Sequence, residues 1–303
     1  MPRFDRHLGI DYSGAGTADT PLTGLRLFEA TAIHGALGDP SRDHRAGPER
    51  DSPSVPTVAV VPPRPDAAGN APPVTTRELR PGAGRGHWTR RGLAAWLAAT
   101  LTASRRPIMV GIDHGFSFPE AYFAAHGVPR DWHRFLPDFC AHWPSDAPGM
   151  TVEALRHSRT AGAARRGGQA RWRRLAEVRS GPAKSVFHFD VPGSVAKSTH
   201  AGLPWIHLIG ERVGWHRLHV WPFDGWTPRP GCHVLAEVYP SRWSRALPPR
   251  PDHTPDQHDA ACVAAALAAA DRSGELEAWW SPPLTPAERR QARYEGWILG
   301  VEA

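Results

Sequence analysis

The chain has 303 residues, 41% of them hydrophobic, so it can bury a sizeable core in one large domain or two small ones. Its net charge of +6 favours an anionic partner such as nucleic acid, although all but two of its 36 basic residues are arginines, a bias that a GC-rich bacterial genome also produces. Three scattered cysteines exclude a readable disulfide framework, and the longest apolar run, residues 260–270, is shorter than the roughly 20 residues of a membrane span. We therefore expect a cytoplasmic protein without a membrane segment.

The first part of the chain predicts a hairpin followed by a proline-rich loop region. Residues 6–12 lead into the glycine-rich turn 13–16, which indicates a strand that feeds a loop, and residues 22–33 are the candidate partner strand. Proline is frequent over residues 41–86, and it lacks an amide donor. We expect loop there, except for one short strand within residues 55–61.

An amphipathic helix and a central strand are predicted next. Over residues 87–104, Thr89 can cap a helix, and Leu93 and Leu97 recur on one face. The apolar run 108–112 then predicts a strand that is covered on both faces and ends at Asp113.

Residues 115–185 predict a basic, partly helical insertion. Trp132, Phe135 and Phe139 are spaced as the packing face of a small helix, and the segment 156–184 is dense in arginine. Two interpretations of that segment stay open. It is either a solvated helix or mobile loop, or an arm that contacts phosphates, where Trp172 and its neighbouring arginines stack on bases.

The last part of the chain predicts strands at residues 186–189, 218–221 and 233–239, and a helix over 194–211. The helix over 254–271 is the most clearly specified, because Thr254 is a good N-cap, Pro255 suits the first position and Gln257 completes a capping box.

Four carboxylates occupy positions that call for a compensating charge. Asp11 in GIDYSG and Asp113 in VGIDHGFSFP each end a predicted strand, where side chains point into the ligand-binding crevice of an open α/β sheet. Glu237 lies among apolar residues in a third strand, and Asp259 lies near the start of the capped helix, on its packing face. Each carboxylate also has an explanation that needs no metal. The two strand-end aspartates can cap turns, Glu237 can pair with Arg242, and Asp259 can interact with the dipole at the helix N-terminus. Together and in this order, they indicate a metal site.

The order strand-Asp, helix, strand-Asp, strand-Glu, helix-Asp resembles the RNase H-like superfamily. The segments GIDYSGA, VGIDHGFSFP, AEVYPSRW and DQHDAACVAAALAAAD, about a fifth of the chain, are similar to a bacterial family of predicted RNase H-like nucleases. The resemblance implies one domain over residues 1–303, an α/β fold with a mixed five-stranded sheet flanked by helices. The chain departs from the superfamily in two ways: the helix over 87–104 carries no glutamate, and the insertion has no counterpart in the core fold.

The resemblance also implies a nuclease. Asp11, Asp113, Glu237 and Asp259 would hold Mg²⁺ or Mn²⁺, with Asp11 bridging two ions about 3.5–4 Å apart that hydrolyse a phosphodiester. His114 and His258 follow or precede these aspartates and are candidates for proton transfer. Nucleic acid is the expected partner, and both DNA and RNA fit this expectation.

Two other functions remain open. The same superfamily includes nucleotide-binding phosphotransferases and ATPase-like enzymes, and residues 193–199 superficially resemble a phosphate loop, although Ala196 stands where a glycine should precede Lys197. Alternatively, the chain is a catalytically silent nucleic-acid-binding or interaction protein, for which its 13 tryptophans would provide a surface.

Overall fold

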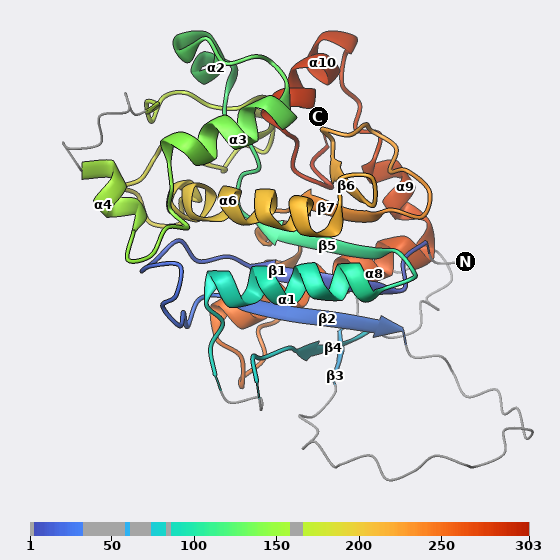
Figure 1. The fold of residues 1–303 in the computed structure, drawn as a ribbon. Coiled ribbons are helices and arrows are strands. Elements are labelled where there is room, and N and C mark those ends of the chain that lie inside the picture. The colour runs from blue at the N-terminus through green and yellow to red at the C-terminus, as the bar shows by residue number, and fades with distance from the viewer. Residues whose placement is uncertain (1–2, 33–57, 61–73, 83–85, 158–165, 303) are drawn as a thin grey trace, which may run out of the picture.

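The computed structural model describes residues 3–32, 58–60, 74–82, 86–157 and 166–302, which form a mixed seven-stranded sheet with helices on both faces (Figure 1). The strands are β1 (Arg6–Asp11), β2 (Arg26–Ala32), β3 (Val58–Val60), β4 (Val74–Glu78), β5 (Ile108–Asp113), β6 (Leu218–Trp221) and β7 (His233–Glu237). The helices are α1 (Arg90–Ala103), α2 (Glu120–His126), α3 (Trp132–His142), α4 (Val152–His157), α5 (Leu175–Arg179), α6 (Ala196–Val213), α7 (Ser241–Ser244), α8 (Pro255–Ser273), α9 (Glu275–Trp279) and α10 (Pro286–Glu295).

The strand order is β3-β4-β2-β1-β5-β7-β6. The pairs β3–β4, β4–β2 and β2–β1 are antiparallel, whereas β1–β5, β5–β7 and β7–β6 are parallel. The expected mixed α/β sheet is therefore confirmed, but it has seven strands rather than five.

Two sequence predictions about strands are wrong. Strand β4 lies in the region that we expected to be loop, because its β-branched residues Val74, Thr75 and Thr76 pair with β2 between the prolines. Residues 186–189 form turns instead of a strand. There the amide of Val186 donates to the Glu177 carboxylate, and the amide of His188 donates to the Ser185 carbonyl, so neither is free for a strand partner.

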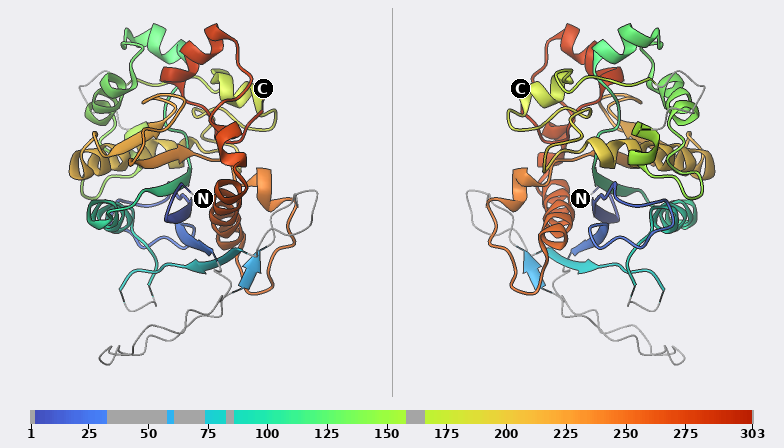
Figure 2. Two further views of the ribbon diagram at one scale, coloured as in Figure 1. Left: turned by 90° about the vertical axis from the view of Figure 1, so that its right-hand side faces the viewer. Right: turned by 90° about the vertical axis from the view of Figure 1, so that its left-hand side faces the viewer.

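The helices cover the sheet in two layers. Figure 2 shows α8 on one face of the sheet and α1 with α6 on the other. The face toward α1 and α6 is built from larger aliphatic side chains, such as Ile10 and Ile112. All 13 tryptophans are buried or partly buried, so they belong to the core rather than to an exposed interaction surface. Among the described residues, no helix is long and apolar enough to span a membrane.

Two glycines let α8 lie directly on the central strands. Gly9 and Gly111 are neighbours in the β1–β5 register. A Cβ on Gly9 would lie 2.3 Å from the Ala260 carbonyl oxygen and 2.6 Å from the Ala264 amide nitrogen, both backbone atoms of α8. The alanine-rich sequence of α8 provides the matching small surface, since its alanines from Ala260 onward are largely buried. The helix can approach this closely only because both surfaces lack bulk.

This packing predicts that Gly9→Ala destabilises the fold. The new methyl group would meet helix backbone, which cannot rotate away, so we expect a loss of about 1–3 kcal/mol or more in the free energy of unfolding. Urea denaturation measures the loss. Gly167→Ala is the matched control, because nothing lies within 4 Å of a Cβ there, and it should change stability by less than about 0.5 kcal/mol. Equal stability of the two variants would contradict the packing argument.

Candidate functional site

Asp11 and Asp113 end the two central parallel strands side by side. They are partners in the β1–β5 register, as the sequence analysis expected for neighbouring strand ends. Side chains alternate along a strand, so Asp11 shares a face with Gly9, and Asp113 shares it with Gly111. This is the face against which α8 packs. Both carboxylates therefore lie where the first turns of α8 meet the sheet.

The start of α8 brings two more aspartates to this place. A complete capping box fixes the start of the helix: the Thr254 amide donates to Gln257 Oε1 (2.9 Å), and the Gln257 amide donates to Thr254 Oγ1 (3.3 Å). Asp259 lies close enough for its charge to act on both Asp11 and Asp113. Asp256 also lies close enough for its charge to act on Asp11.

Sequence reasoning missed Asp256, although a signal was present. Asp256 and Asp259 are three residues apart, which places them on the same face of a helix. A second carboxylate at that spacing, in the first turn of a well-capped helix, could have been added to the predicted set.

The clustered carboxylates raise one another's pKa. Burial, followed by the charges of Asp113, Asp256 and Asp259, holds the pKa of Asp11 well above its ordinary value. Burial and the charges of Asp259 and Glu237 raise the pKa of Asp113 to about 8. Burial raises the pKa of Asp256 despite the opposing charge of nearby Arg26, which is already paired with Glu78 (2.9 Å). When its carboxyls are ionised, the cluster therefore has more negative charge than its cationic neighbours can offset.

These oxygen ligands suit a hard divalent cation. Magnesium and manganese favour carboxylate oxygens, and a cation would relieve the repulsion that raises the pKa values. In the described part of the chain, however, no three His, Cys, Asp or Glu side chains are arranged as a preformed metal site. Asp11, Asp113 and Asp259 would have to rotate toward a common point to share an ion.

Glu237 is placed differently from the three aspartates. Its register partner on β5 is Ile112 rather than Asp113, and its side chain lies on the face toward α6. Both carboxylate oxygens accept hydrogen bonds from the Arg174 guanidinium, at 2.6 and 2.7 Å, and Oε2 also accepts from the Phe116 amide (3.0 Å). Of the four predicted carboxylates, the structure groups Asp11, Asp113 and Asp259, whereas Glu237, which lines a small pocket with Asp113, is held in a buried ion pair.

Arg174 itself was not singled out by the sequence. Its Nε donates to Glu177 Oε1 (2.8 Å), so that one guanidinium pairs with two buried carboxylates. Burial opposes the charged form, but the charges of Glu237 and Glu177 outweigh it and raise the pKa of Arg174. The insertion is rich in arginine, but its sequence does not indicate that one of these arginines is buried.

Other arginines of the insertion also bind the protein itself. Arg156 pairs with Asp190, Arg166 with Asp138 and Arg179 with Glu288. Trp172 is partly buried and packs edge-on to Phe187. The described part of the segment 156–184 therefore has few of the free cations that a phosphate-contacting arm would need; residues 158–165 lie outside the described residues.

The two candidate proton-transfer histidines are engaged elsewhere. His114 is buried on the face toward α1 and α6, where its Nδ1 donates to the Gly115 carbonyl (2.9 Å) and burial lowers its pKa to about 4. The Nε2 of His258 lies 3.1 Å from the Ser244 carbonyl. Neither is placed beside the three grouped aspartates in an arrangement that favours proton transfer.

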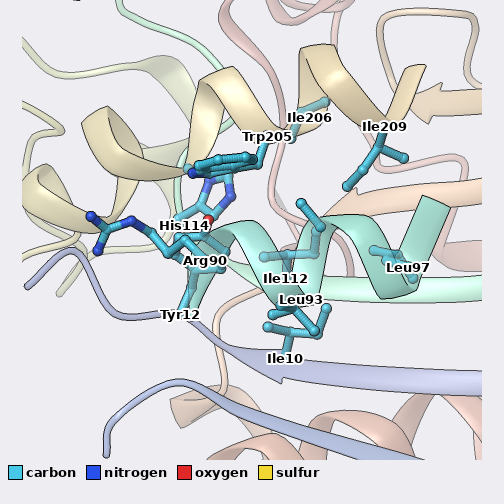
Figure 3. A pocket seen from close by; sticks show the side chains of 12 residues that line it. Ile10, Tyr12, Arg90, Leu93, Leu97, Ile112, His114, Trp205, Ile206 and Ile209 are labelled. Atoms are coloured by element: carbon cyan, nitrogen blue, oxygen red, sulfur yellow. The ribbon is translucent and has the colours of Figure 1, made fainter. Parts of the chain in front are cut away.

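A small pocket lies between the sheet, α1 and α6. Figure 3 shows Tyr12, Arg90, His114 and Trp205 gathered at one end and aliphatic side chains such as Ile209 at the other. The Tyr12 hydroxyl, Arg90 Nε, His114 Nε2 and Trp205 Nε1 are buried and have no hydrogen-bond partner among the described residues. With a volume of about 20 Å³, the pocket has room for one water molecule.

An open cleft lies between the glycine-rich turn that follows β1 and the start of α6. Its volume is about 470 Å³, and its lining includes the turn 13–16, Glu153, Ser194 and Lys197. Arg90 holds the turn by donating to the carbonyls of Ser13 (3.3 Å) and Gly16 (3.0 Å). Helix α6 begins at Ala196, and Lys197 pairs with Glu153 at 2.5 Å. The segment 193–199 thus forms a helix start beside the cleft, not a phosphate loop.

No model of a known protein family matches the chain, and neither the curated proteins nor the solved structures contain a significant match to it. The arrangement of its own residues therefore carries the functional argument.

The raised pKa values predict that the metal-free chain gains stability as the pH falls. An unfolded aspartate titrates near pH 3.9, whereas folded Asp113 titrates at about 8, so between these values the folded state binds more protons. The free energy of unfolding should then decrease as the pH rises from about 4 to about 8. Thermal unfolding, measured in the presence of a chelator, should show a smaller change in stability across this pH range for Asp113→Asn than for the wild type. Asp5→Asn, at an exposed carboxylate, is the control; an Asp113→Asn profile equal to that of the control would contradict the prediction.

The pocket in Figure 3 predicts an ordered water molecule. A high-resolution crystal structure should show one solvent peak within hydrogen-bonding distance of at least two of the atoms Tyr12 OH, His114 Nε2 and Trp205 Nε1. Side chains that collapse to close the pocket, with those atoms bonded to protein groups instead, would contradict it.

Proposed function

We propose that the chain is a metal-dependent phosphodiester hydrolase that acts on nucleic acid. The observation that carries the proposal is the pairing of Asp11 with Asp113 in one register, beneath the helix start that supplies Asp259. Three partly buried carboxylates, whose charges help to raise the pKa values of Asp11 and Asp113 on the face against which α8 packs, are costly for the fold, and a bound cation offsets that cost.

The topology supports the RNase H-like resemblance. A hairpin of β1 and β2, an antiparallel third strand, helix α1 and the parallel strand β5 follow one another in the order that the resemblance implies. The third strand is β4, although the sequence suggested one within residues 55–61, where β3 adds a further strand outside β4. Strand β6 extends the opposite edge.

The aspartates have distinct roles in the proposed metal site. Asp11, Asp113 and Asp259 would hold Mg²⁺ or Mn²⁺, and Asp256 adds a further negative charge beside Asp11 that favours a bound cation. When bound, the cation supplies Lewis acidity, which polarises a phosphoryl oxygen and lowers the pKa of water. Burial of Asp113 excludes bulk water and strengthens each of these charge interactions.

The cleft at the glycine-rich turn after β1 is the proposed path of the nucleic-acid backbone. It adjoins the turn that follows β1, and it offers the Ser194 hydroxyl, turn amides and the Lys197 ammonium group to phosphates. Lys197 would exchange its exposed partner Glu153 for a phosphate, which costs little because exposed ion pairs are weak.

The size of the same cleft also favours a second candidate. A volume of about 470 Å³ matches that of a nucleotide site, so a phosphotransferase or ATPase-like enzyme of the same superfamily is the alternative function. Hydrolysis of nucleoside triphosphates without cleavage of nucleic acid would favour that alternative.

The test is cleavage of labelled single- and double-stranded DNA and RNA in the presence of Mg²⁺ or Mn²⁺. We expect cleavage that a chelator abolishes and that Asp11→Asn lowers by about 10³-fold or more, because Asp11 would hold the cation. Asp5→Asn is the control with normal cleavage. The proposal fails if the folded wild type cleaves none of these substrates, or if Asp11→Asn cleaves as fast as the control.

A further inference from the structure

The inference concerns how many metal ions the proposed site can hold. A two-metal site needs carboxylates on both sides of a shared ligand, and the sequence assigned Glu237 to that role. In the structure, Glu237 lies on the face toward α6, whereas Asp11 and Asp113 lie on the face toward α8. Glu237 nevertheless lines a small pocket together with Asp113, so its existing partners decide whether it can bind an ion.

Both carboxylate oxygens of Glu237 already accept hydrogen bonds. Two parallel bonds from Arg174, at 2.6 and 2.7 Å, and a third from the Phe116 amide occupy both of its oxygens. This bidentate geometry is the strongest form of carboxylate–arginine pairing. The side chains of Arg174 and Glu237 are 1% and 4% exposed, so water does not compete for either partner.

The cation at this place is shared between two carboxylates. Arg174 pairs with Glu177 as well as Glu237, and its raised pKa keeps the guanidinium charged. A second metal ion at Glu237 would either lie against this buried cation or displace it. Displacement would leave a charged guanidinium and the Glu177 carboxylate buried without their partner, which is strongly unfavourable.

We propose that Arg174 is a built-in cation that takes the place of a second metal ion at Glu237, so that the site binds one divalent ion, held by Asp11, Asp113 and Asp259. The inference rests on the proposed function, because it concerns the same metal site. It makes Arg174 a positioning residue and removes Glu237 from the metal ligands. It also gives the insertion a role, since Arg174 comes from the segment between β5 and β6.

The first measurement is the stoichiometry of Mn²⁺ binding to the full chain, by calorimetry and by the Mn²⁺ electron paramagnetic resonance signal. We expect one ion per chain. Two ions in the wild type would overturn the inference but leave the proposed function standing. No bound ion would instead overturn the proposed metal site, and the inference with it.

Two variants test the role of Glu237 at constant charge. The double variant Arg174→Gln/Glu237→Gln removes one positive and one negative charge, so the net charge near Asp113 is unchanged. It should still bind one Mn²⁺, with a Kd within about threefold of the wild type, whereas Asp113→Asn should raise the Kd by about tenfold or more. A tenfold loss in the double variant would show that Glu237 is a ligand and overturn the inference.

The single variant Arg174→Gln tests whether Arg174 takes the place of a second metal ion. It leaves Glu237 and Glu177 without their cation, so a second Mn²⁺ should bind. Circular dichroism and thermal unfolding show whether each variant is folded. A folded Arg174→Gln that still binds a single ion would contradict the inference. If neither variant folds, the wild-type stoichiometry decides alone: one ion supports the inference, and two overturn it.

Discussion

The contact between α8 and the paired glycines Gly9 and Gly111 is the constraint on which the rest of the structure depends. Because neither strand carries a side chain at this point, the helix backbone rests directly on β1 at Gly9, and the α8 side chains of Val263 and Leu267 fill the space above Gly111 on β5. The same approach determines where the first turns of α8 lie, two residues farther along each strand from the glycines. Asp259 is thereby brought to Asp11 and Asp113. Close packing and the carboxylate cluster are consequences of one arrangement.

The proposed metal ligands and the buried residues behind them lie on opposite faces of the central strands. Toward α8 lie the like-charged carboxylates, which raise each other's pKa and reduce stability near neutral pH. Toward α6 lie their neighbours in sequence, Tyr12 and His114, together with the buried pair of Arg174 and Glu237. Negative charge that lacks a protein partner is thus confined to one face, where a cation can reach it.

Local patterns predicted most of the elements that position the site. The capping residues of α1 and α8 and the apolar run of β5 are confirmed, because these signals depend only on near neighbours in sequence. Strand β4 was missed because flanking prolines concealed a short β-branched segment, and 186–189 was mistaken for a strand because an apolar run looks the same whether it pairs or packs. Contacts between residues far apart in the sequence could not be predicted from such patterns. Arg174 and Glu237, for example, are 63 residues apart, and no periodicity links them.

The central claim is that Asp11, Asp113 and Asp259 form one metal centre. Anomalous diffraction from crystals grown with Mn²⁺ tests it most directly, because the scattering locates the ion without reference to activity. The account predicts a single strong peak between the strand ends and the start of α8, with Arg174 still paired to Glu237. A peak bound by Glu237, or ions only at surface carboxylates away from Asp11 and Asp113, would contradict it.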